Sequence, residues 1–203
     1  MHKTTPINHN YYIHPRGACE ILQEQELGLA FLSIPKNAST TIRDNSRNNQ
    51  DKWDLNQTVW SKLCKRFCVI LRDPAERFIS AYNMFINAGR GVDLSKRIVR
   101  VIKTNEDGST WLDSTDQHLT PQSSFLIDLN RIVEQTNMPV DYFYMKDSLI
   151  DDINEHYQIQ LVNHKSNAAP QRVVTAVNPS VMQSVYQADY ELINNVNFVN
   201  HNF

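Results

Sequence analysis

The chain has little glycine and little cysteine, and it lacks long apolar runs. It contains five glycines in 203 residues, with none between Gly28 and Gly89. The G-x-x-x-x-G-K-[ST] phosphate-binding loop is therefore absent. Its three cysteines show no framework spacing, which excludes a disulfide scaffold and favours a reducing compartment. No apolar stretch approaches the roughly 20 residues of a membrane helix, so we expect no membrane span.

The length and the N-terminal composition set further expectations. A chain of 203 residues fits a single domain, which we expect over 1–203, with an N-terminal extension at 1–27 and a core at 28–196. The first residues contain no apolar segment typical of a signal peptide. We therefore expect a complete, short cytoplasmic protein of a bacterium or of a virus-infected host cell. Nothing in the composition indicates an oligomeric state.

Apolar runs and helical periodicity predict alternating strands and helices. Such alternation favours an α/β fold with parallel strand pairing and ligands at the carboxyl ends of the strands. We expect strands at 29–34, 67–71 and 141–145, with a short one at 158–162. We expect helices at 18–25, 39–47, 57–65, 74–87, 92–103, 122–136, 147–157 and 179–196.

The first chemical motif follows the apolar run Leu29–Ile34. Pro35 ends this run, and one lysine and several small or hydroxylated residues come next: Lys36, Asn37, Ala38, Ser39, Thr40 and Thr41. A strand that turns into a helix start offers free backbone N–H groups and the positive end of a helix dipole. Together with the lysine charge, this pattern predicts a phosphate or sulfate site. The alternative is an ordinary turn with Ser/Thr caps.

The second motif begins at Arg72, where the strand-like run Phe67–Leu71 ends. Asp73 is a favourable N-cap, Pro74 suits the first helical position, and Ser80 lies about two turns into the predicted helix. The segment from residue 60 to residue 103 carries ten Lys and Arg against three acids, although the whole chain has a net charge of −2. This excess fits an anionic ligand, although a solvated helix face would also explain part of it.

These two motifs together resemble those of the sulfotransferase family, which uses 3′-phosphoadenosine 5′-phosphosulfate (PAPS). Pro35-Lys36-Asn37-Ala38-Ser39-Thr40 is similar to the 5′-phosphosulfate loop P-K-x-G/A-[ST]-T, and Arg72 with Ser80 has the spacing of the 3′-phosphate site. The sequence from Arg72 to Tyr82 looks most like the corresponding segment of carbohydrate sulfotransferases of the chondroitin, dermatan and heparan type. Weaker matches include Asp116–Gln122, which resembles H-W-x-P-Q, and Tyr186–Leu192, which resembles Y-x-x-D-Y-x-L.

The resemblance implies a P-loop-like three-layer α/β fold, with a central, mainly parallel sheet flanked by helices. It implies PAPS as donor and adenosine 3′,5′-bisphosphate as product. Lys36 would offset charge on the leaving phosphate, residues 37–41 would contact the phosphosulfate, and Arg72 and Ser80 would hold the 3′-phosphate. The partner would be a glycan or a small hydroxylated acceptor. We expect no metal, because no metal-ligand spacing is present.

The general base is less well indicated. Between Thr41 and Arg72, where the family often has His or Glu, this chain has neither. His118 is therefore our candidate base, with Asp51 and Asp54 as substitutes and a structural histidine as the alternative. Lys165 and Asn167 are further candidates for cofactor contact, although an exposed loop would equally explain them.

Other functions stay open at this point. A P-loop-like nucleotide phosphotransferase or hydrolase would need a magnesium site. A non-catalytic nucleotide-binding module would keep the anion pocket without a base. Nucleic-acid binding is not expected, because the basic block lacks interleaved aromatics and known motifs.

Overall fold

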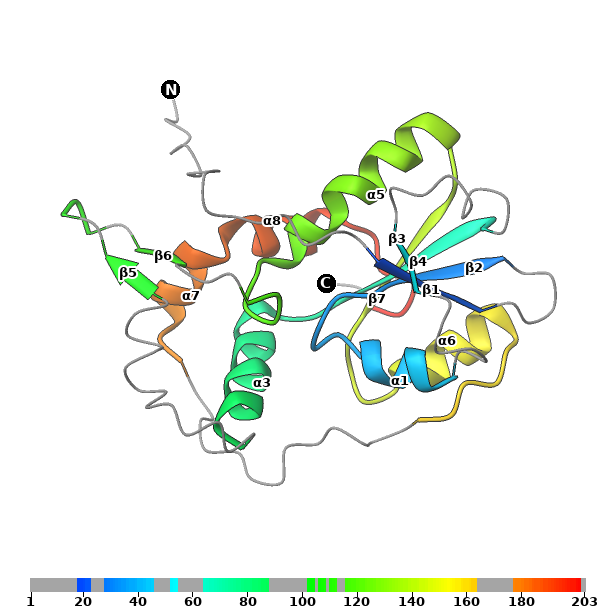
Figure 1. The fold of residues 1–203 in the computed structure, drawn as a ribbon, viewed down its shortest axis with the longest axis horizontal. Helices are drawn as coiled ribbons and strands as arrows, with labels where there is room; N and C mark the ends of the chain where they lie inside the picture. The colour runs from blue at the N-terminus through cyan, green and yellow to red at the C-terminus, as the bar shows by residue number, and fades with distance from the viewer. Residues whose placement is uncertain are drawn as a thin grey trace.

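The computed structural model describes residues 18–22, 28–45, 52–54, 64–87, 102–104, 106–108, 110–112, 116–163 and 177–201. Within these ranges, three parallel strands form the centre of a sheet (Figure 1). β2 (Leu29–Leu32) pairs with β4 (Arg66–Leu71), and β4 pairs with β7 (Val140–Tyr144). β1 (Ala18–Leu22) pairs antiparallel with β2, and β3 (Lys52–Asp54) pairs antiparallel with β1, which gives the strand order β3-β1-β2-β4-β7.

Helices cover both faces of this sheet. Described helices are α1 (Ser39–Asn45), α3 (Pro74–Asn87), α5 (Gln122–Thr136), α6 (Leu149–Tyr157), α7 (Pro179–Val185) and α8 (Gln187–Asn195). A hairpin of β5 (Ile102–Thr104) and β6 (Thr110–Leu112) lies beside α7 (Figure 1). The expected α/β fold, with a parallel central sheet flanked by helices, is confirmed.

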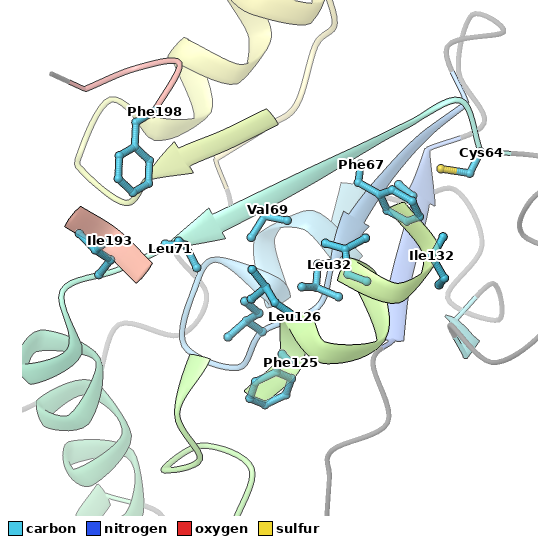
Figure 2. Close-up of a cluster of buried hydrophobic side chains, with 13 residues drawn as sticks. Leu32, Cys64, Phe67, Val69, Leu71, Phe125, Leu126, Ile132, Ile193 and Phe198 are labelled. Atoms are coloured by element: carbon cyan, nitrogen blue, oxygen red, sulfur yellow. The ribbon is translucent and has the colours of Figure 1, made fainter. Parts of the chain in front are cut away.

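The alternation of side chains along β4 explains the three layers. Phe67, Val69 and Leu71 point to one face, where they pack with apolar residues of α5 and α8 (Figure 2). Cys68 and Ile70 point to the other face, against α1 and α6. Because successive side chains of a strand alternate between faces, a continuous apolar run is what a strand buried on both sides requires.

Most element predictions hold to within two or three residues, which is the usual uncertainty of an element boundary. The helices at 74–87 and 122–136 are confirmed at both ends. The strand at 29–34 is shorter, since it ends at Leu32. Two helix predictions fall largely outside the described residues: most of the one at 57–65, and residues 92–101 of the one at 92–103. The last two residues of the second prediction, Ile102 and Lys103, belong to β5.

Three element predictions are wrong. Residues 18–22 form β1 rather than part of a helix, because they pair antiparallel with β2. Residues 158–162 form no strand: the side chains of Asn45 and Asn154 bond to the backbone of Val162 and Leu161 instead. The helix at 179–196 is divided at Tyr186, which joins α7 to α8.

None of the described helices has the length and apolar character to cross a membrane.

Candidate functional site

The loop after β2 turns through two left-handed residues. Lys36 has a φ of 69° and Ala38 a φ of 57°, while Asn37 between them is not left-handed. Backbone that alternates between right- and left-handed residues can turn successive N–H groups toward one anion, but in this loop the N–H of Asn37 donates to the Ile34 carbonyl instead. A left-handed conformation costs an L-residue such as alanine roughly 1–2 kcal/mol, so the shape of the loop is imposed by its surroundings.

α1 begins directly after this loop. N–H groups in the first turn of a helix have no intrahelical acceptor, and the helix dipole places partial positive charge there. The hydroxyls of Ser39 and Thr40 make no hydrogen bond to another described residue, and both residues are partly buried. The N–H groups of the first turn and these two hydroxyls therefore lie at the loop that the sequence predicts as an anion site.

The side chain of Asn37 faces the interior instead of the outside of the loop. Asn37 is 2% exposed, and its Nδ2 donates to the carbonyl of Ile70 at 2.8 Å and to Oε1 of Gln122. Its backbone N–H donates to the carbonyl of Ile34 at 3.2 Å. The side-chain amide is thus committed inside the protein and not to a bound phosphosulfate.

Arg72 leaves the end of β4 at the point where α3 starts. Asp73 caps α3 as expected, since its Oδ1 accepts from the N–H of Glu76 at 2.9 Å. Within the described ranges, the contacts of the Arg72 guanidinium are long, both at 3.4 Å: Nε to a Glu76 carboxylate oxygen and Nη1 to the Lys36 carbonyl. Ser80 lies partly buried on α3, and no hydrogen bond joins it to Arg72 in the described part of the chain.

The two motifs converge as the parallel sheet predicts, and their charges interact. Burial lowers the pKa of the Lys36 ammonium, and the positive charges of Arg72 and Arg77 lower it further. Mutual repulsion among cations is unfavourable unless an anion lies among them. A bound anion would relieve this repulsion, in addition to the Glu76 carboxylate that already pairs with Arg72.

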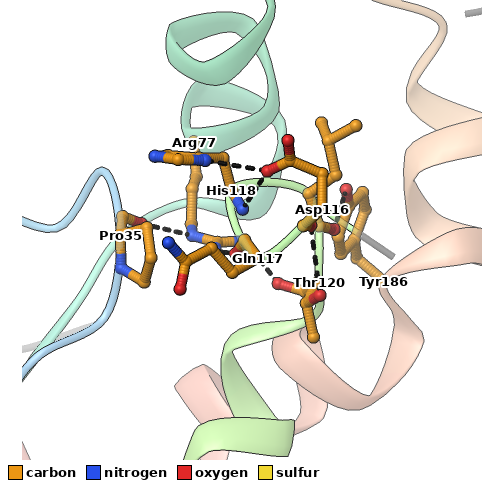
Figure 3. Close-up of polar contacts among 8 residues, drawn as sticks. Pro35, Arg77, Asp116, Gln117, His118, Thr120 and Tyr186 are labelled. Atoms are coloured by element: carbon orange, nitrogen blue, oxygen red, sulfur yellow. Dashed lines mark hydrogen bonds and ion pairs between the residues drawn. The ribbon is translucent and has the colours of Figure 1, made fainter. Parts of the chain in front are cut away.

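Arg77 is the member of this cation group that sequence reasoning left without a role. It is 1% exposed, and its guanidinium donates to three carbonyls: Pro35 at 3.0 Å, Thr120 at 2.7 Å and Gln117 at 3.2 Å (Figure 3). Arg77 thus joins the Lys36 loop to the segment before α5. The position of Arg77 within the second motif was the only feature of the sequence that pointed to this role.

The C-terminal helices hold this same segment from the other side. The Tyr186 hydroxyl donates to the Leu119 carbonyl at 2.8 Å. The Asp189 carboxylate accepts from the N–H groups of Gln122 and Ser123, both at 2.8 Å, at the start of α5. Burial raises the pKa of Asp189, and these donors partly oppose that rise. The weakly matching C-terminal motif is therefore structural.

His118 lies in the segment that Arg77 binds. Its Nδ1 is 2.8 Å from Oδ1 of Asp116, and that oxygen also accepts from the His118 backbone N–H at 2.8 Å (Figure 3). The His118 side chain is 28% exposed. When the Asp116 carboxylate accepts a hydrogen bond from Nδ1–H, Nε2 carries the lone pair, and this is the tautomer that a general base needs.

The structure does not test the remaining candidates. Asp54 ends β3, and Asp51, Lys165 and Asn167 lie outside the described residues. Among the residues that are described, no group of three or more His, Cys, Asp or Glu could hold a metal ion.

Comparison with known proteins agrees with this geometry. The family model described as "Sulfotransferase family" matches residues 20–175, which include the Lys36 loop, Arg72, Arg77 and His118. No curated protein and no solved structure matches the chain. The family match spans more than half of the chain, so this protein belongs to the sulfotransferase family.

Proposed function

We propose that the protein binds PAPS and transfers its sulfuryl group to a hydroxyl of a carbohydrate or a related acceptor. The observation that carries the proposal is the convergence of Lys36, Arg72 and Arg77 around a loop with alternating handedness. A ligand with two separate anionic groups would use both motifs at once.

The residues fit such a ligand. The described ion pair of Arg72 is with Glu76, at 3.4 Å, and the Glu76 side chain is 62% exposed, so solvent screens it. A phosphate that approaches Arg72 competes with a weak partner. At Lys36, the same anionic ligand relieves the repulsion that lowers the pKa of the ammonium group.

Each of the two motifs would then bind a different anionic group of the ligand. Lys36, the backbone of Ala38, and the hydroxyl-bearing Ser39, Thr40 and Thr41 hold the 5′-phosphosulfate. Arg72 and Ser80 hold the 3′-phosphate, with Arg72 making charge-assisted hydrogen bonds. Asn37 shapes the loop through its inward amide bonds. When bound, PAPS supplies the sulfuryl group.

Lys36 and His118 are the proposed catalytic residues. Lys36 stabilises the negative charge that grows on the leaving phosphate oxygen, an effect that contributes most in the transition state. His118 takes the proton of the acceptor hydroxyl at Nε2, while Asp116 keeps the proton on Nδ1. Arg77 connects the two residues, since it binds the carbonyls of Pro35 and Gln117, each adjacent to one of them.

The choice of a carbohydrate acceptor rests on the likeness of the segment from Arg72 to Tyr82 to carbohydrate sulfotransferases. A transfer assay tests it: PAPS labelled with ³⁵S is incubated with desulfated chondroitin, dermatan or heparan in the presence of a chelator. We expect label on at least one glycan, and much slower labelling with Lys36→Ala. Label only on small phenols would contradict the carbohydrate assignment, and a strict magnesium requirement would favour the phosphotransferase alternative.

The cytoplasmic location stays a prediction from the composition, and cell fractionation tests it.

A further inference from the structure

Gln122 makes hydrogen bonds to both anion-binding motifs at once. It has no exposed surface and is the first residue of α5. Its Oε1 accepts from the backbone N–H of Arg72 at 2.9 Å and from Nδ2 of Asn37. Its Nε2 donates to the carbonyl of Arg72 at 2.7 Å. The side chain therefore binds both backbone groups of Arg72 and, through Asn37, the Lys36 loop.

This pattern requires a primary amide. A planar amide presents one acceptor and one donor side by side, which matches the N–H and C=O of a single residue. A carboxylate has no donor, and an apolar side chain would leave three buried polar groups without partners. The backbone of Gln122 is itself fixed, since its N–H donates to Asp189 at 2.8 Å.

Asn37 shows that the link constrains the loop. Both N–H groups of its side chain point to fixed acceptors, the Ile70 carbonyl and Oε1 of Gln122, and its Oδ1 is buried without a hydrogen-bond partner in the described structure. An unsatisfied buried acceptor costs about 1–3 kcal/mol. The surroundings thus hold the amide in an orientation that keeps the link to Gln122 at the expense of Oδ1.

We propose that Gln122 is a positioning residue that sets the spacing between the Lys36 loop and Arg72 to suit the two anionic groups of one ligand. The proposal rests on the proposed function, because it assumes a ligand that engages both motifs. Gln122 has no exposed surface and contacts no ligand itself. Its effect lies in pre-organisation, which lowers the ordering cost for a ligand that bridges two sites.

The test compares ligands that use both motifs with ligands that use one. Calorimetry measures the affinities of adenosine 3′,5′-bisphosphate, 5′-AMP and 3′-AMP for the wild-type chain and for Gln122→Met. We expect the preference for the bisphosphate over each monophosphate to fall about tenfold in Gln122→Met, roughly the effect of one or two net hydrogen bonds. The affinity for each monophosphate should change far less.

A second variant and a control make the result interpretable. Asn37→Ala breaks the same link at its other end and should lower the same preference, so the test stands even if Gln122→Met does not fold. Gln135→Met, an exposed glutamine of the same helix, should leave the preference unchanged. A purely structural role would lower the melting temperature of the variants and leave the preference intact, which would overturn the inference.

Failure of the proposed function would look different. If the wild-type chain bound the bisphosphate no better than the monophosphates, the two-motif ligand itself would be wrong. If the wild-type chain preferred the bisphosphate and both linking variants kept that preference, only the role of Gln122 would be wrong.

Discussion

Replacing Arg77 by methionine should destabilise the protein strongly, although the residue is not expected to contact substrate. Its guanidinium donates to the carbonyls of Pro35, Thr120 and Gln117 at 2.7–3.2 Å. Hydrogen bonds from a charged donor contribute about 1.5–3 kcal/mol each, or roughly 4–9 kcal/mol together. Removing a buried charge also removes its desolvation penalty of several kcal/mol. The net loss should be about 2–5 kcal/mol.

Urea unfolding followed by circular dichroism measures this loss. A thermal melt gives a second measure: for a chain of this size, each kcal/mol shifts the melting temperature by about 2–4 °C. We therefore expect the melting temperature of Arg77→Met to fall by roughly 4–20 °C. Arg131→Met is the matched control, because Arg131 is exposed on α5 and forms an ion pair with Asp128 three residues away, on the protein surface. Surface changes of this kind stay within about 0.5 kcal/mol.

Arg77→Lys separates the charge from the shape of the group. Lysine keeps the positive charge but cannot reach three carbonyls with a planar fork. We expect Arg77→Lys to recover only part of the lost stability. Full recovery would show that the charge alone matters, and an Arg77→Met variant as stable as Arg131→Met would refute the proposed joining role.

Three further expectations concern turnover and pH. Lys36→Ala should lower kcat more than it raises the KM for PAPS, because its charge acts mainly in the transition state, and steady-state kinetics would show the opposite split if Lys36 only bound ligand. His118→Ala should lose about 10²–10⁴-fold in kcat with bisphosphate affinity intact, and an unchanged kcat would remove the assignment. Burial alone would raise the pKa of Asp141, but hydrogen bonds from Tyr157 and Arg66 outweigh it and hold that pKa below its usual range. The stability that Asp141 contributes is therefore present above the pKa of the unfolded state and is lost as pH falls through the pKa of the folded state. In acid unfolding, the wild-type chain should lose free energy of unfolding below about pH 4, and Asp141→Asn should lack this loss.

Local patterns were enough to predict the elements that carry the site. The apolar runs at 29–34 and 67–71 and the capping residues around Asp73 located β2, β4 and the start of α3. Because parallel strands place their carboxyl ends together, the meeting of Lys36 and Arg72 also followed from the sequence. These features depend on residues close in the chain or on a general rule of topology.

Long-range contacts account for what sequence reasoning missed. Residues 18–22 form a strand through pairing with β2 and β3, and Tyr186, where the helical pattern is interrupted, donates to the carbonyl of Leu119. Gln122 and Arg77 bind partners that lie about 40–85 positions away along the chain, as with Asn37 and Pro35. Such bonds leave no periodicity, so sequence reasoning showed the two residues in motifs and left their roles open.

The central claim is that one ligand engages both the Lys36 loop and Arg72. Its most direct measurement is a calorimetric comparison of adenosine 3′,5′-bisphosphate with 5′-AMP, in a chelator, for the wild-type chain and for Arg72→Ala. We predict that wild type prefers the bisphosphate and that Arg72→Ala loses about 2–4 kcal/mol for it, with little change for 5′-AMP. Equal wild-type affinities for the two nucleotides, or binding that requires a divalent metal, would contradict the account.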